Sequence, residues 1–173
     1  MNKRIVTTLL ASAILMSACS SSPTGRKQFV LLPDAQINEM GVTSFNEMKQ
    51  EVPISSSDAT KSNVQCVADR IIAVLPDKYR QQDWEVVVFD DQQVNAFALP
   101  GAHIGVYTGL LGVAKNQDQL ATVIGHEVAH VLADHSNERL SQSQLANTGL
   151  SLANVVIGAS EYKQYQEMTM AAL

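Results

Sequence analysis

The feature that most constrains this chain is the pentapeptide at residues 126–130, which reads His-Glu-Val-Ala-His. Histidines four residues apart lie about 40° apart around an α-helix, so both imidazoles can reach one point only if this segment is helical. Apolar side chains recur at helical spacing from about residue 118 to residue 134, which supports that helix. Two neutral imidazoles at this spacing suit Zn²⁺, with one ion per chain. His126 and His130 are therefore the candidate metal ligands.

Glu127 follows the first of these histidines and can reach a metal-bound water without binding the metal itself. Its expected role is to accept a proton from that water and to pass it to a leaving amine. Glu127 is thus the candidate catalytic residue. Gly125 lies inside the same helix, where a missing side chain would allow another backbone to approach closely.

The N-terminus has the pattern of a bacterial lipoprotein signal. Lys3 and Arg4 precede a short apolar stretch that ends in Leu-Met-Ser-Ala-Cys at residues 15–19. A basic flank, a short apolar region and small residues at the cut site are typical of a secretory signal, and the stretch is too short for a comfortable membrane span. We expect residues 1–18 to be a signal peptide and Cys19 to carry lipid. The alternative is an ordinary cleaved signal with an incidental cysteine.

The residue after Cys19 is Ser20, whereas an aspartate there resembles an inner-membrane retention signal. The expected location is therefore the outer membrane, facing the periplasm, with the lipid as the contact to the membrane. Residues 19–32 are expected to be the lipidated N-terminus and a polar tether, because Ser20–Lys27 is rich in Ser, Pro and Gly. Residues 33–173 are expected to form the metal-binding domain.

The composition is that of a globular protein, with 46% hydrophobic and 17% charged residues. The formal charge is −5 and no run of Lys or Arg follows the first few residues, so nucleic acid is not an expected partner. The expected fold is α+β: mostly helical, with a small sheet packed on the helix that carries residues 126–130. Helices are predicted near residues 34–53, 58–75, 118–134 and 137–157, and strands near 84–89, 95–99 and 103–107.

Further blocks surround the pentapeptide: Asn-Ala-Phe-Ala-Leu-Pro-Gly at 95–101, Ile-Gly-Val-Tyr-Thr-Gly-Leu-Leu at 104–111, then His135 and Arg139. This order resembles the HtpX and CAAX-prenyl-protease family of zinc metallopeptidases, and more closely its periplasmic lipoprotein members that act in envelope protein quality control. The resemblance covers roughly residues 28–173. In that family an extended segment before the active-site helix pairs with the substrate backbone. The resemblance therefore implies a substrate-binding role for Asn95, Ala96, Phe97, Ile104 and Gly105.

The family's third zinc ligand is a glutamate on a later helix, in a motif that this sequence does not show. The chain therefore resembles the N-terminal part of a longer protease, and Glu161 and Glu167 are only weak candidates for the ligand. His135 lies about 140° further round a continuous helix than His130, so it is expected to support a ligand or to act as a helix C-terminal cation. His103 is expected to be a surface histidine.

The leading hypothesis is an endopeptidase that degrades misfolded or misassembled periplasmic and outer-membrane proteins. One alternative is an inactive, chaperone-like lipoprotein that binds unfolded clients. A weaker alternative is a structural envelope lipoprotein with an incidental motif. Cys66 has two interpretations, a buried small apolar residue or a disulfide with a partner outside this chain.

Overall fold

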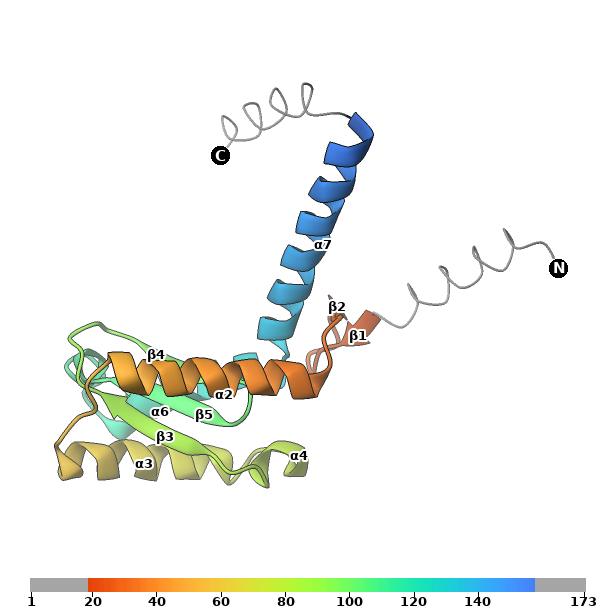
Figure 1. The fold of residues 1–173 in the computed structure, drawn as a ribbon. Coiled ribbons are helices and arrows are strands. Elements are labelled where there is room, and N and C mark those ends of the chain that lie inside the picture. Colours follow the sequence, from red (N-terminus) through yellow and green to blue (C-terminus); the bar gives the residue numbers. More distant parts are fainter. Residues whose placement is uncertain (1–18, 158–173) are drawn as a thin grey trace.

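The computed structural model describes residues 19–157. A small sheet lies between helices, and the helix that contains residues 126–130 packs on one side of it (Figure 1). The fold is α+β and mostly helical, as expected. The strands and helices, in chain order, are β1 (Cys19–Ser21), β2 (Lys27–Phe29), α2 (Asp34–Glu51), α3 (Asp58–Ile72), α4 (Asp77–Arg80), β3 (Glu85–Phe89), β4 (Ala96–Leu99), β5 (His103–Tyr107), α5 (Thr108–Leu111), α6 (Gln117–Leu132) and α7 (His135–Ile157).

The main sheet has the strand order β3-β5-β4, so β5 is central and β4 forms an edge. β3 runs parallel to β5, while β4 runs antiparallel to it. The turn between β4 and β5 is tight because Gly101 and Ala102 adopt positive φ angles of 88° and 68°. The Pro-Gly pair that ends the 95–101 block therefore lies at this turn.

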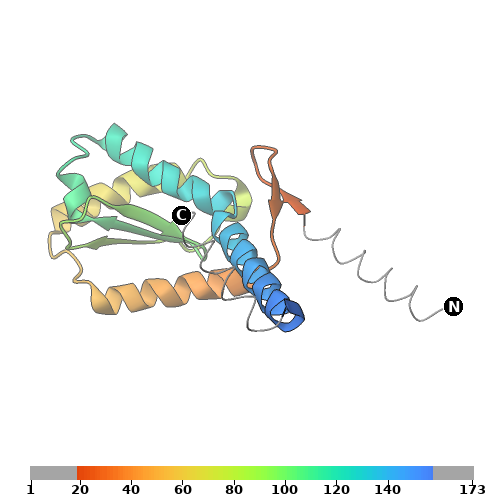
Figure 2. The same ribbon diagram turned by 90° about the horizontal axis from the view of Figure 1, so that it is seen from above.

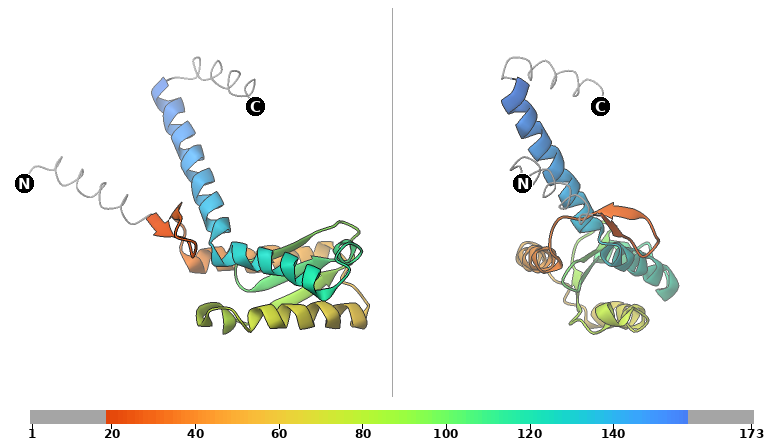
Figure 3. Two further views of the ribbon diagram at one scale, coloured as in Figure 1. Left: turned by 180° about the vertical axis from the view of Figure 1, so that it is seen from behind. Right: turned by 90° about the vertical axis from the view of Figure 1, so that its right-hand side faces the viewer.

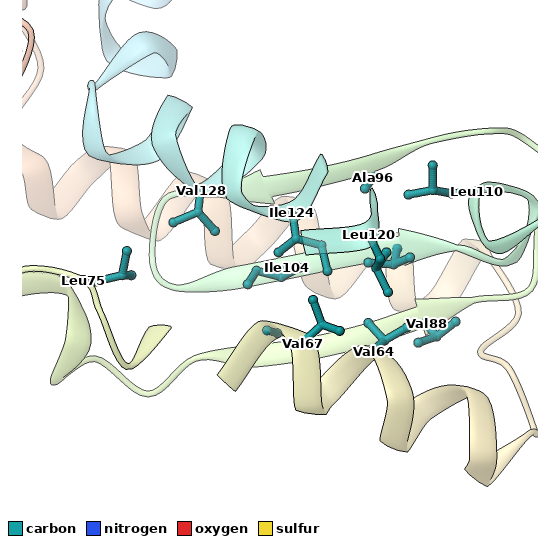
Figure 4. Packing of buried hydrophobic residues seen from close by; sticks show 12 residues of the cluster. Val64, Val67, Leu75, Val88, Ala96, Ile104, Leu110, Leu120, Ile124 and Val128 are labelled. Atoms are coloured by element: carbon teal, nitrogen blue, oxygen red, sulfur yellow. The ribbon is translucent and has the colours of Figure 1, made fainter. Parts of the chain in front are cut away.

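One face of the sheet packs on α3 and α6 through aliphatic side chains. Figure 4 shows α6 presenting Leu120, Ile124 and Val128 to this face, with α3 contributing Val64 and Val67. All five are at most 3% exposed. β-branched residues suit the strands because alternate side chains enter this core. The predicted packing of the sheet against the site helix is confirmed.

The other face packs on α2 through aromatic side chains. Phe45 of α2 is fully buried and contacts Phe89 and Phe97 edge-on, with ring centroids 6.0 and 6.1 Å apart. Figure 3, in its end-on view, shows α2 on the opposite side of the sheet from α6. His103 stacks on Phe45 at 4.6 Å between centroids and is only 7% exposed. The expectation of a surface histidine at position 103 is wrong, because alternation along β5 turns this side chain inward.

The polar tether expected at Ser20–Lys27 is not a tether in the structure. β1 and β2 pair as an antiparallel hairpin, closed by Gly25 with a φ of 81°. Ser22 and Gln28 are 6% and 3% exposed, so polar side chains of this segment are buried. In Figure 2 the hairpin lies beside the start of α7, which runs away from the body of the molecule. The folded unit therefore begins before residue 33.

Candidate metal centre

The helix α6, which contains residues 126–130, packs on the core with one face, and its opposite face is accessible to solvent. Its N-terminus is capped by Asn116, whose side chain accepts a hydrogen bond from the backbone N–H of Gln119 at 2.9 Å. Its buried stripe consists of Leu120, Ile124 and Val128. His126 and His130 each follow a stripe residue by two positions, which is about 200° round the helix. The core thus fixes the helix and turns both imidazoles away from the sheet.

The two histidines converge on one point. His126 Nε2 lies 3.0 Å from His130 Nε2. Ligand atoms of His126, Glu127 and His130 all lie within 4.8 Å of one another. A tetrahedral zinc ion with bonds of about 2.05 Å would hold two such nitrogens ~3.3 Å apart, so a small ring rotation suffices to admit the ion. The donor set and its geometry fit zinc, and His126 is open to solvent.

No other His, Cys, Asp or Glu within residues 19–157 joins this group as a ligand. Catalytic zinc sites usually have three protein ligands, with a fourth position left for water or substrate. The described residues thus provide two ligands and the adjoining carboxylate. Glu161 and Glu167 lie outside the described residues.

His135 lies beside His130, although a continuous helix would have carried it away. α6 ends at Leu132, and Asp134 adopts a positive φ of 53°, which breaks the helix before α7 starts. This break returns His135 to the site, where its Nδ1 lies 2.5 Å from Nδ1 of His130. His135 therefore contacts Nδ1 of His130, whereas the candidate ligand atoms are the Nε2 atoms of His126 and His130. This position agrees with a supporting role for His135.

A shallow pocket of about 320 Å³ adjoins the histidines on the α7 side, lined by Arg26, His130, His135, Glu138, Arg139 and Gln142. Arg26 donates two hydrogen bonds to the Glu138 carboxylate, at 2.7 and 2.5 Å. These bonds, with one from Gln28, hold the pKa of Glu138 down at about 2. Burial raises the pKa of the neighbouring Asp134. No local sequence pattern predicts this cluster, because Arg26 lies 112 residues from Glu138.

The five residues predicted to bind substrate do not form one surface. Ile104 and Gly105 belong to the central strand β5, whose two edges are both paired, and Ala96 is buried in the core. Phe97 faces α2, where its ring covers Gly105; a Cβ at Gly105 would lie 2.1 Å from that ring. Asn95 is exposed and precedes β4. The side chains of Ile104 and Ala96 are buried, and Gly105 has none, so the surface that this segment offers to a substrate is the backbone edge of β4. Substrate binding by these five residues stays a prediction.

Other predicted features differ in outcome. Residues 1–18 lie outside the described part, so the signal peptide stays a prediction, as does lipid on Cys19. Cys66 is free and half-buried, which is less burial than expected for a small apolar core residue. A disulfide with a partner outside this chain stays a prediction. A Cβ added at Gly125 would meet no atom within 4 Å, so no close approach occurs there among the described residues. Between residues 19 and 157, no helix is both long and apolar enough to cross a membrane.

Comparisons with known proteins point to one family. Residues 58–173 match peptidase family M48. The chain is 37% identical over 100 residues to the mitochondrial metalloendopeptidase OMA1 of Schizosaccharomyces pombe, covering 58% of this chain and 29% of that protein. It is 27% identical over 162 residues to the metalloprotease LoiP of Escherichia coli, covering 79% and 60%. It is 25% identical over 88 residues to a putative beta-barrel assembly-enhancing protease of Vibrio cholerae, covering 51% and 18%. The chain spans less than two thirds of each of these relatives.

Proposed function

The chain belongs to peptidase family M48, and on that premise we propose that it is a zinc-dependent metalloendopeptidase of the bacterial envelope. The observation that carries the proposal is the convergence of His126 and His130 on one point, with the Glu127 carboxylate beside them on a helix fixed by the core. The match to family M48 includes this helix. No observation favours the inactive, chaperone-like alternative, since neither the two imidazoles nor the carboxylate is missing.

The chemistry follows from the positions of these side chains. Zn²⁺ held by His126 and His130 would polarise the scissile carbonyl and make an attacking water more acidic. Glu127 is close enough to the imidazoles to take the proton of that water and to return it to the leaving amine. The exposure of His126 leaves room for a peptide to enter from solvent.

The free edge of β4 is the proposed binding site for the substrate backbone. Tyr107 donates its backbone N–H to the Asn95 carbonyl at 3.0 Å, so Asn95, Phe97 and Leu99 direct their backbone groups toward β5. In an antiparallel pair the intervening residues, Ala96 and Ala98, direct theirs to the other edge. α6 packs against β4, and Pro100, directly after β4, lines a pocket together with His130. An extended peptide added here would bind with little demand on its sequence.

The proposed substrates are misfolded or misassembled periplasmic and outer-membrane proteins. One relative supports this choice by name, the putative beta-barrel assembly-enhancing protease of V. cholerae. The N-terminal signal pattern, with Cys19 after small residues, points to the same compartment. Placement among the HtpX-type members of the family is part of this proposal.

The proposed anchor is lipid on Cys19, at the outer membrane. Because β1 begins at Cys19, the lipid would hold the folded unit directly at the membrane surface. We expect the Cys19→Ser protein to move from the membrane fraction to the soluble fraction and to lose labelling by a radioactive fatty acid. Labelling that persists in Cys19→Ser would contradict the anchor and leave the proposed chemistry standing.

The activity is tested by cleavage of unfolded casein with the zinc-loaded full-length protein. We expect Glu127→Gln to keep its zinc and to cleave at least ~100-fold more slowly, because a general base contributes that much or more. Glu47→Gln, an exposed glutamate on α2, is the matched control and should cleave at the wild-type rate. A Glu127→Gln protein that still cleaves casein normally would overturn the proposed mechanism.

A further inference from the structure

The N-terminal hairpin forms hydrogen bonds at the junction between α6 and α7, to residues that lie before and after His135 in the chain. We call residues 19–32, which comprise this hairpin and the segment after it, the strap. On one side, the Gln28 amide donates a hydrogen bond to the Ala133 carbonyl at 2.6 Å. On the other side, Arg26 pairs with both oxygens of Glu138, and Gln28 adds a third bond at 3.2 Å. Ala133 and Glu138, which flank His135 in the chain, are thus both bonded to the strap.

Hydrogen bonds of the strap backbone with two side chains of α7 extend these contacts along that helix. The Leu31 N–H donates to Ser141 Oγ at 2.9 Å. Leu32 exchanges two hydrogen bonds with the Asn137 side chain, at 3.3 and 2.7 Å. Asn137 and Ser141 are 2% and 0% exposed, so these bonds are shielded from water. The amide oxygen of Gln28 has no partner among the described residues, so the two donated bonds are what hold this side chain.

The first turn of α7, once held, places His135 against His130. The two Nδ1 atoms are 2.5 Å apart, and the ring centroids are 4.8 Å apart. Only one of two facing ring nitrogens can carry the proton of such a bond. If His130 donates from Nδ1, its Nε2 keeps a free lone pair, which is the state that binds zinc. That Nε2 is the atom directed toward His126.

We propose that the strap is a positioning element for the metal site, acting through His135 to hold His130 in the tautomer with its proton on Nδ1. This rests on the proposed function, in that His130 is taken as a zinc ligand. Arg26, Gln28 and His135 are positioning residues, because they act on the metal site through His130. If Cys19 is lipidated, the strap is also the segment next to the anchor, so the site is aligned by the part of the chain nearest the membrane.

The test reads the His130 tautomer by ¹⁵N–¹H NMR of the imidazoles, in full-length protein without metal. Wild type should show one protonated and one bare nitrogen for His130. In Arg26→Met/Gln28→Leu and in His135→Phe, the two ¹⁵N shifts should move toward each other as the tautomers interconvert. Lys61→Met is the matched control, because it breaks another cation–carboxylate pair, with Asp58, in the first turn of α3, which lies at the opposite end of the molecule from the strap (Figure 1). Its His130 signals should equal those of wild type.

The second readout is the affinity for Zn²⁺, measured by competition with a chromophoric chelator. Both positioning variants should bind zinc roughly 10- to 100-fold more weakly, the usual effect of losing a group that orients a ligand. Folding is checked by far-UV circular dichroism. Should the double variant not fold, Arg26→Met alone serves, because that side chain is 51% exposed.

Strap variants that are folded and keep the wild-type tautomer and zinc affinity would overturn the strap proposal while leaving the protease proposal intact. Conversely, a wild-type protein that binds no zinc and cleaves no casein would contradict the proposed function. A strap-dependent tautomer in that protein would still support the positioning role.

Discussion

The two faces of the main sheet are built from the same three strands, yet they use different chemistry. Toward α3 and α6 the sheet presents aliphatic residues, and this core holds the site helix. Toward α2 it presents aromatic rings together with His103, whose neighbours include Glu85 and Lys49. A stretch such as residues 95–101 alternates between the two faces. Its side chains therefore serve two different cores, although its backbone forms a single edge near the metal centre.

The comparison teaches that stability and site geometry are separable in this fold. The start of α2 lines a pocket with His130 through Asp34, Ile37 and Asn38, but the aromatic cluster around Phe45 does not belong to that lining. The α6 face contributes burial and also fixes the direction of both histidines. Substitutions in the aromatic cluster should therefore change the free energy of unfolding and leave zinc binding by the folded protein unchanged. Substitutions and changes of pH can test this separation, from the largest expected effect to the smallest.

Phe45→Ala should lower the free energy of unfolding by about 3–5 kcal/mol, because it removes a fully buried ring that contacts three other rings. Urea unfolding measures the loss. The zinc affinity of the folded fraction should equal that of wild type, and a drop in that affinity would break the proposed separation. Phe45→Leu provides the same comparison if the alanine variant does not fold.

Gly105→Ala should lower the free energy of unfolding by about 1–3 kcal/mol. The new methyl group would lie 2.1 Å from the Phe97 ring, which must then shift within the aromatic cluster. Thermal unfolding of this variant beside Gly105→Ala/Phe97→Leu checks the cause. If the second substitution restores none of the loss, contact with Phe97 is not the reason for glycine at this position.

Stability should fall as the pH drops below about 6.5, because of His103. Burial lowers the pKa of His103 below its ordinary value of 6.5, with Glu85 opposing the shift. The unfolded chain then takes up a proton that the folded chain does not, so acidification favours unfolding in this range. His103→Phe, which keeps a ring against Phe45, should abolish the dependence. A persistent decline in that variant would assign it to another group.

The strap should respond at lower pH than His103. The pKa of Glu138 is held at about 2 in the folded protein, against an ordinary value of 4.5. Its stabilising contribution is therefore complete above about pH 4.5 and is lost as the pH falls toward 2. Urea unfolding of Glu138→Gln across this range should show no such loss, which separates the two regions on the pH axis.

Gly125→Ala should raise the free energy of unfolding by up to ~1 kcal/mol, because alanine favours a helix and the added Cβ meets no atom within 4 Å. This is the opposite sign to Gly105→Ala on the other face. Casein cleavage should be unchanged. A stable variant that cleaves poorly would show that substrate backbone approaches α6 at residue 125.

Much of the fold was predictable because its elements have strong local patterns. The β-branched run before Phe89 and the helical stripe of α6 are each sufficient to identify an element. The same periodicity placed His126, Glu127 and His130 together. The inward direction of His103 could not be predicted, since it depends on which face of β5 meets α2 and not on the local sequence.

The strap and the approach of His135 depend on contacts between distant residues. β1 and β2 have three residues each and the composition of a loop, so they form only through packing on α7, more than 100 residues away. The break at Asp134 also lacked a clear sequence signal, because aspartate tolerates the left-handed region without requiring it. A continuous helix was therefore the natural, and wrong, basis for placing His135.

The most direct test of the central claim is the zinc content of full-length protein after dialysis, measured by atomic emission for wild type, Glu127→Gln and His130→Leu. We predict one zinc per chain in the first two proteins and none in His130→Leu, because the ion requires both imidazoles and not the base. Zinc retained by His130→Leu at the wild-type level would contradict the assignment of the metal centre to α6.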